Sequence, residues 1–219
     1  MMRIATLLVP LLSASVGPAS AQPAAESSVF RSIELRGGGS VTVRHGDAHR
    51  VTVIEGGTNR PIRTDGDRLV IDECSSDCRG GHRIRVEIVA PEIARLAVAN
   101  GGRIELRGDF PSQSTVAASV SSGGMIDLRP LEAEQASASI DQGGRILVHA
   151  RSTLSANVSN GGNVTYWGDP SILSSIRLGG VVEQGVSSDL ARPIAEFDPQ
   201  PPPLPALPSI KPPRRGEGH

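Results

Sequence analysis

Apolar and polar residues alternate in short runs along most of the chain, and from Leu96 to Gly185 these runs recur in a repeat marked by paired glycines. Alternation with a period of two is typical of β-strands. Successive glycine pairs are 22, 20, 18 and 18 residues apart, and a repeat in this range predicts stacked structural units. The sequence therefore predicts an all-β fold, specifically a β-solenoid. The pairs are Gly101-Gly102, Gly123-Gly124, Gly143-Gly144, Gly161-Gly162 and Gly179-Gly180.

The alternation also predicts which side chains face inward. Leu96 and Val98 precede the first glycine pair and Ile104 and Leu106 follow it, so these four are expected in the core. Equivalent positions of later repeats are again mostly apolar, through Tyr166 and on to Ile176, Leu178 and Val182 of the last repeat. The intervening positions are expected to face solvent in rows along the stack, which include Glu105, Asp127, Leu147 and Thr165 in one row and Arg107, Arg129, His149 and Trp167 in the next.

The glycine pairs are expected to form the corners between the two strands of a repeat. A tight corner of this kind needs positive φ, which glycine adopts without steric cost. Equivalent corners of stacked repeats also come close together, so a side chain there would clash. One repeat buries too few side chains to be stable alone, which makes stacking necessary.

Five shorter alternating segments lie between Phe30 and Val89, separated by turn-forming sequences. This arrangement predicts antiparallel strands. We expect them to begin the solenoid and to cap its first repeat, because an uncovered sheet edge invites pairing with another chain. The segments are SIELRG, SVTVRHG, RVTVIEG, DRLVIDE and RIRVEIV.

Several segments also carry a resemblance to a known family. They are VFRSIELRGGGSVTVRHGD, DRLVIDE, IRVEIVAPEIARLAVANGG and GGNVTYWGDP, in that order. Over about Val29 to Gly185 the chain resembles the head GIN domain of auto-transporter adhesins, a bacterial family. The resemblance implies a right-handed β-helix-like fold and suggests a cell-surface or adhesive function. It supplies no catalytic residues, and this chain has Gly-Gly where the family usually has glycine-serine-glycine corners.

The two ends of the chain lack the repeat. Residues 1–21 contain one basic residue, an apolar run and the small-residue site Ala19-Ser20-Ala21, as in a cleavable secretory signal. Residues 22–28 are read as a linker, residues 29–185 as the domain and the proline-rich residues 186–219 as a disordered tail. We therefore expect a periplasmic or secreted bacterial protein with no membrane span after signal cleavage.

Cys74 and Cys78 lie close together between two strand segments. In an exported chain a disulfide between them is the favoured interpretation. A metal site that also uses His82 is the alternative, although a fourth ligand for structural zinc is not apparent. A redox-active pair is a further alternative, but the Cys-x-x-Cys spacing is missing.

No nucleophile elbow, Walker loop or metalloprotease motif occurs, so the sequence favours a protein that is not an enzyme and has no cofactor. The formal net charge of −1 and the interspersed charges argue against nucleic acid.

We expect an envelope-associated binding module for an envelope protein or a surface glycan. The alternatives are a carbohydrate-active enzyme that uses Glu105 and Asp127, and a structural spacer. The tripeptide Arg107-Gly108-Asp109 is of integrin type but is equally explained as a turn. The candidate binding surface comprises Arg107, Arg129, His149, Tyr166 and Trp167.

Overall fold

The computed structural model describes residues 29–55, 62–72 and 84–190. Within these residues it contains 14 strands and one short 3-10 helix, η1 (Ser187–Asp189), so the all-β class is confirmed. Cys74, Cys78, His82, the signal segment and the tail beyond Leu190 lie outside the described residues. The strands are β1 (Ser32–Arg36), β2 (Gly39–His45), β3 (Arg50–Glu55), β4 (Ile62–Asp65), β5 (Arg68–Ile71), β6 (Ile84–Ala90), β7 (Arg95–Ala99), β8 (Arg103–Arg107), β9 (Gln113–Ser121), β10 (Met125–Asp141), β11 (Arg145–Ser159), β12 (Asn163–Trp167), β13 (Ser171–Ile176) and β14 (Val181–Gln184).

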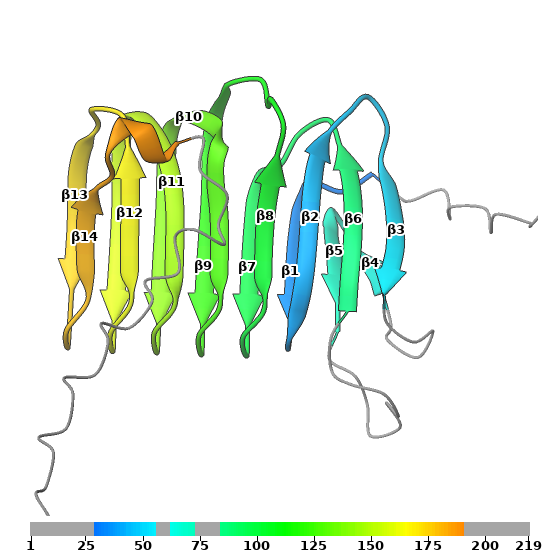
Figure 1. Cartoon of the computed structure of the whole chain (residues 1–219), viewed down its shortest axis with the longest axis horizontal. Helices are drawn as coiled ribbons and strands as arrows, with labels where there is room; N and C mark the ends of the chain where they lie inside the picture. The colour runs from blue at the N-terminus through cyan, green and yellow to red at the C-terminus, as the bar shows by residue number, and fades with distance from the viewer. Residues whose placement is uncertain (1–28, 56–61, 73–83, 191–219) are drawn as a thin grey trace, which may run out of the picture.

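The strands form one strongly curled sheet with two facing layers (Figure 1). The first layer has the order β3-β6-β2-β8-β10-β11-β12-β14, and the second has the order β4-β5-β1-β7-β9-β10-β11-β13. The long strands β10 and β11 start in the first layer and end in the second. The two layers are therefore continuous with each other through these strands.

Equivalent residues of successive repeats lie directly beside one another. Ile104 of β8 is paired with Ile126 of β10, which is paired with Ile146 of β11. Val164 of β12 and Val182 of β14 continue the same row. All these pairings are parallel, so each inward side chain packs against its counterpart in the next repeat.

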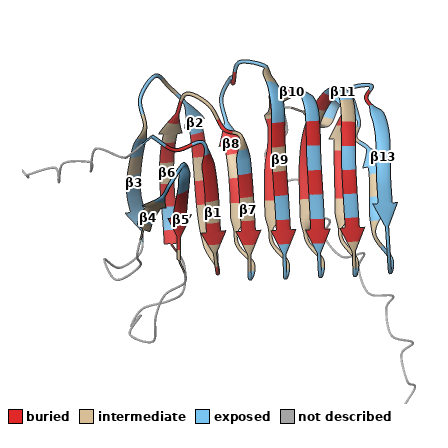
Figure 2. Ribbon diagram, turned by 180° about the vertical axis from the view of Figure 1, so that it is seen from behind, coloured by how far each residue is buried: buried red, intermediate tan, exposed pale blue. Residues whose placement is uncertain are grey.

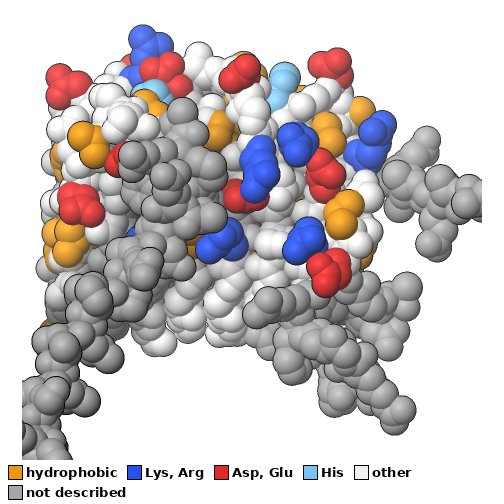
Figure 3. Space-filling view, in the orientation of Figure 1, with side chains coloured by type: hydrophobic (Ala, Val, Ile, Leu, Met, Phe, Trp, Pro, Cys, Tyr) orange, Lys and Arg blue, Asp and Glu red, His pale blue; other side chains and the backbone are white. Residues whose placement is uncertain are grey.

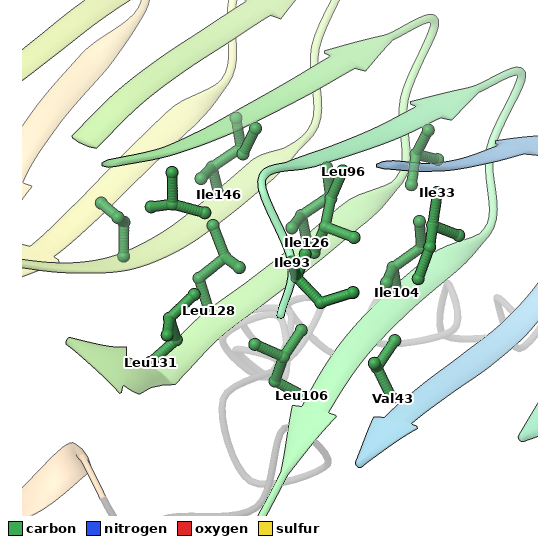
Figure 4. Close-up of a cluster of buried hydrophobic side chains, with 14 of the residues drawn as sticks. Ile33, Val43, Ile93, Leu96, Ile104, Leu106, Ile126, Leu128, Leu131 and Ile146 are labelled. Carbon is green, nitrogen blue, oxygen red and sulfur yellow. The ribbon is translucent and has the colours of Figure 1, made fainter. Parts of the chain in front are cut away.

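The core lies between the two layers and runs the length of the stack. Inward positions are buried and outward positions are more exposed, which gives the alternation along the strands in Figure 2. Figure 4 shows aliphatic side chains of both layers meeting in this core, with Ile33, Ile93 and Leu96 opposite Ile104, Leu106 and Ile126. Fully burying each such side chain stabilises the fold by about 1.5–3 kcal/mol.

The glycine pairs lie in the turns that connect the two layers. In the first four pairs both glycines have φ between 80° and 116°, whereas in the last pair only Gly179 has positive φ. The two members of a pair differ in their surroundings. A Cβ on Gly123 would have open space around it, but a Cβ on Gly124 would lie 2.6 Å from Val98 Cγ1 and 2.9 Å from the Gly102 carbonyl oxygen.

The expectation of antiparallel strands at the start of the chain is wrong for most of that region. β1 is parallel to β5 and β7, and β2 is parallel to β6 and β8. Among the described strands, only the outermost two, β3 and β4, are antiparallel to their neighbours. Alternation fixes which side chains face inward but is the same for both strand directions, so the sequence could not distinguish them.

The two ends of the stack differ. At one end the antiparallel strands β3 and β4 cover β6 and β5 (Figure 1). At the other end β13 and β14 are the last described strands, and Ile172 and Ile176 of β13 remain 40% and 46% exposed. These two side chains follow the inward register of Leu154 and Val158, but within the described residues no further repeat covers them. Leu178 was also expected to face inward and is 80% exposed.

The difference between Gly123 and Gly124 gives a first prediction. Gly124→Ala should lower the free energy of unfolding by about 1–3 kcal/mol more than Gly123→Ala, because it adds a clash with a backbone carbonyl to the strain of positive φ. Urea denaturation of the two variants measures the difference. Ser139→Ala, at an exposed position of β10, is the control and should change stability by about 0.5 kcal/mol or less. If Gly123→Ala and Gly124→Ala lowered the free energy of unfolding equally, the clash of the new methyl group at position 124 with the Gly102 carbonyl would have no energetic cost.

Candidate binding face

The outward side chains of the first layer form three rows, which we call the charged face. The rows follow from the parallel register: residues paired across neighbouring strands point to the same side of the sheet. Figure 3 shows basic and acidic side chains interspersed on this side of the molecule. From β6 to β14, the first row is Arg85, Ser40, Arg103, Met125, Arg145, Asn163 and Val181, the second is Glu87, Thr42, Glu105, Asp127, Leu147, Thr165 and Glu183, and the third includes Arg44, Arg107, His149 and Trp167.

The first row borders a groove of about 700 Å³ next to the glycine turns. Arg85, Arg103 and Arg145 line it together with Glu55 of the edge strand β3. Ser40, Ile84 and Met125 also line it, together with glycines from four successive turns, Gly39, Gly102, Gly124 and Gly144. The space that a Cβ would need at Gly102, Gly124 and Gly144 is filled by neighbouring backbone and core side chains, so these glycines let successive turns pack closely beside the groove.

The second and third rows pair with each other. Arg44 Nε donates to Glu87 Oε1 at 2.6 Å, and Arg107 forms an ion pair with Glu105 at 2.7 Å. Thr42 Oγ1 also donates to Glu105 at 3.2 Å. The arginine side chains of these pairs are at least half exposed, so each pair contributes only about 0–1 kcal/mol. Their main effect is to orient and neutralise the acidic row.

At the β12 end, the structure corrects the predicted exposed surface. Trp167 and Arg129 are 2% and 5% exposed, and Asp127, Leu147 and Thr165 are also buried, so the expectation that these residues face solvent is wrong. The reason is that the chain after β14 folds back over this part of the first layer (Figure 1). Trp167 Nε1 donates to the Val186 carbonyl at 2.8 Å.

Arg129 is the centre of this buried cluster. Its Nε and Nη2 donate to the two carboxylate oxygens of Asp127 at 2.9 and 2.7 Å, and its Nη1 donates to the Asp189 carbonyl. The guanidinium also lies 5.7 Å from the ring centroid of Trp167. Alternation within the strands could not reveal this cluster, because the segment that covers it comes from beyond the last repeat.

The rest of the predicted surface lies nearby but does not converge on one site. Arg107 is exposed and forms an ion pair with Glu105. The Nε2 atom of His149 lies 3.9 Å from Oε1 of Glu132. Tyr166 was expected to face inward and is only partly buried against the core. In the Arg107-Gly108-Asp109 tripeptide, Gly108 has φ 83°, as a turn after β8 requires. No cluster of three or more metal-ligating residues occurs in the described part of the chain.

The outward face of the second layer is less charged. A smaller pocket of about 380 Å³ is bordered mostly by small residues, including Ala97, Ala117 and Ser119. At its edge Glu34 accepts hydrogen bonds from Arg36 at 2.7 Å and from Arg68 at 3.0 Å. Burial raises the pKa of the Glu34 carboxyl, but the hydrogen bonds and charges of the two arginines outweigh it, so this pKa is lowered overall.

The buried pair makes a prediction about stability. Arg129→Met should lower the free energy of unfolding by about 3–5 kcal/mol, because it leaves the Asp127 carboxylate buried without its partner. The matched control is Arg107→Met, whose ion pair is half exposed and should contribute about 1 kcal/mol or less. Urea midpoints compare the two. If both variants lost a similar free energy of unfolding, the structural role of the buried Arg129–Asp127 pair would be contradicted.

The lowered pKa of Glu34 predicts a pH dependence. A carboxyl with a lower pKa in the folded state stabilises the fold above its unfolded pKa of about 4.3, and this contribution is lost as the pH falls through the folded value. Glu34→Gln should therefore destabilise the protein near pH 7 and have a progressively smaller effect in acid. Denaturation curves across pH measure this. Glu55→Gln, at a carboxylate that is 61% exposed, is the control, and a Glu34 effect that persists unchanged at low pH would refute the explanation.

Comparisons with solved structures give similar proteins at low identity. A putative adhesin from Bacteroides fragilis is 15% identical, with a TM-score of 0.40, over 74% of this chain and 94% of that chain. A putative adhesin from Parabacteroides merdae is 14% identical, with a TM-score of 0.35 and coverage of 74% and 94%. A putative lipid binding protein from Parabacteroides distasonis is 17% identical, with a TM-score of 0.31 and coverage of 73% and 94%.

No curated protein matches the sequence. Among the described residues, no helix has the length and apolar character needed to cross a membrane. One family model does match, over residues 29–116 and 111–170, and its description is putative auto-transporter adhesin, head GIN domain. These ranges include strands of both layers and most of the charged face. Since they span more than half of the chain, the protein belongs to the putative auto-transporter adhesin family of head GIN domains.

Proposed function

We propose that this protein is a non-catalytic, exported binding module that uses the charged face to hold a component of the cell envelope or surface. The observation that carries the proposal is the groove along the glycine turns, where arginines from three strands of a parallel sheet point to the same side. A face of this kind is rigid, because each strand is hydrogen-bonded to its neighbours. Membership of an adhesin family supports a binding role.

The scaffold in this proposal is a right-handed β-solenoid with glycine corners. In-register parallel pairing of successive repeats and positive φ at the first four glycine pairs support it. The right-handed sense follows the strong preference of parallel crossover connections. The domain would then run from residue 29 to about residue 190, since η1 packs against the first layer through Arg129.

The proposal places the protein outside the cytoplasm. Residues 1–21 have the pattern of a cleavable secretory signal, and the adhesin family supports export. A Cys74–Cys78 disulfide belongs to the same proposal, because it would form in an oxidising compartment.

The arrangement of the acidic residues favours binding over hydrolysis. Asp127 is 3% exposed and accepts hydrogen bonds from Arg129 through both carboxylate oxygens. Glu105 is held by Arg107 and Thr42. Glycoside hydrolysis needs one carboxyl group that can donate a proton and a second that can reach the sugar. A carboxylate buried in a bidentate ion pair does neither.

Binding and turnover by the mature full-length protein test the proposal. We expect saturable binding to a glycan array or to isolated envelope fractions, and no release of reducing sugar from a polysaccharide panel. Heat-denatured protein is the control for non-specific adsorption. Polysaccharide cleavage that is lost on Glu105→Gln would support the enzyme alternative, and saturable binding to neither material would support the spacer.

A further inference from the structure

We propose that the groove of the charged face binds a linear polysaccharide that carries one carboxylate per disaccharide, with Arg85 and Arg103 each pairing with one carboxylate. This inference rests on the proposed binding function and specifies its ligand.

The spacing of the arginines is the first argument. Ser40 is paired with both Arg85 and Arg103, and Met125 is paired with both Arg103 and Arg145. The basic residues therefore occupy every second strand, with an uncharged residue between them. Neighbouring strands lie about 4.8 Å apart, which places successive arginines roughly 9–10 Å apart in one line. A disaccharide unit of an extended polysaccharide has a comparable length.

The shape of the groove is the second argument. Its volume of about 700 Å³ is larger than that of the pocket on the second layer, which is about 380 Å³. Its long axis follows the glycine turns, because glycines of four successive turns line it. A narrow polymer laid along the turns can therefore contact the backbone and the arginines of several repeats at once.

The charge balance is the third argument, because it selects a sparsely charged ligand. Next to the basic row lies the acidic row, and Glu87 and Glu105 are neutralised there by Arg44 and Arg107. A nucleic acid carries a charge on every nucleotide and is bound through broad basic surfaces and exposed aromatic side chains. Of the described Phe, Tyr and Trp residues, only Tyr166 is not buried. One carboxylate on every second sugar matches the alternating row better.

Two of the arginines are available to a ligand. Within the described residues, the Arg103 side chain makes no ion pair. Arg85 forms an ion pair with Glu55 at 3.5 Å, and both side chains are exposed. Because an exposed ion pair contributes little free energy, a ligand carboxylate can take the place of Glu55 at little cost. Guanidinium groups bind carboxylates through short, charge-assisted hydrogen bonds.

Hyaluronan, a linear polymer with one carboxylate per disaccharide, is the probe, and isothermal titration calorimetry of the full mature chain measures its affinity at low and high salt. Arg103→Gln should weaken binding about tenfold or more, the loss expected for one charge-assisted hydrogen bond. Arg177→Gln is the matched control, at an exposed arginine after β13 outside the groove, and should leave the affinity unchanged. Binding should weaken with salt, and neutral dextran should not bind.

A second pair of variants keeps the test independent of the folding of Arg103→Gln. Met125→Glu places a negative charge between Arg103 and Arg145 and should abolish binding, whereas Met125→Gln should retain it. The proposal is overturned if hyaluronan does not bind, if Arg103→Gln and Arg177→Gln bind alike, or if polygalacturonate, with a carboxylate on every sugar, binds tighter than hyaluronan. Binding of a different surface component in those cases would leave the broader binding function intact.

Discussion

The structure depends on hydrogen bonding between parallel strands in register from one repeat to the next. Each strand leaves its backbone N–H and C=O groups directed along the stack, and only a neighbouring repeat can satisfy them. The same register places Ile104, Ile126 and Ile146 in one continuous row of the core. A residue that disturbs this register therefore affects backbone bonding and side-chain packing together. Gly124 occupies such a position, because the carbonyl of Gly102 in the preceding repeat leaves no space for a side chain.

The register that builds the core also builds the outer surface. Because equivalent residues stand side by side, a residue type that recurs at one position becomes a row on the face of the sheet. The first row of the charged face arises in this way, with Arg85, Arg103 and Arg145 alternating with Ser40 and Met125. A ligand with its own repeat can match such a row, which is why the proposed occupant is a polymer.

Alternation predicted the inward positions well, because burial on one face of a strand is a local property of the sequence. Leu96, Val98, Ile104 and Leu106 are all buried as expected. The prediction failed for the direction of the first strands and for the outward residues near β12. Strand direction depends on which segments pair, and β1 and β2 lie between repeats that come later in the sequence. Trp167 looked exposed because alternation says nothing about a segment that returns to cover the sheet.

The sequence by itself determined the all-β class, the repeat and the inward face of most strands, since these follow from local periodicity and from the steric freedom of glycine. Only the tertiary structure decided which charges are buried and which are available. Asp127 and Glu105 occupy equivalent positions of adjacent strands, yet one is buried with Arg129 beneath η1 and the other is held at the surface by Arg107. The difference comes from what packs above each position, and packing between distant segments is not contained in a local pattern.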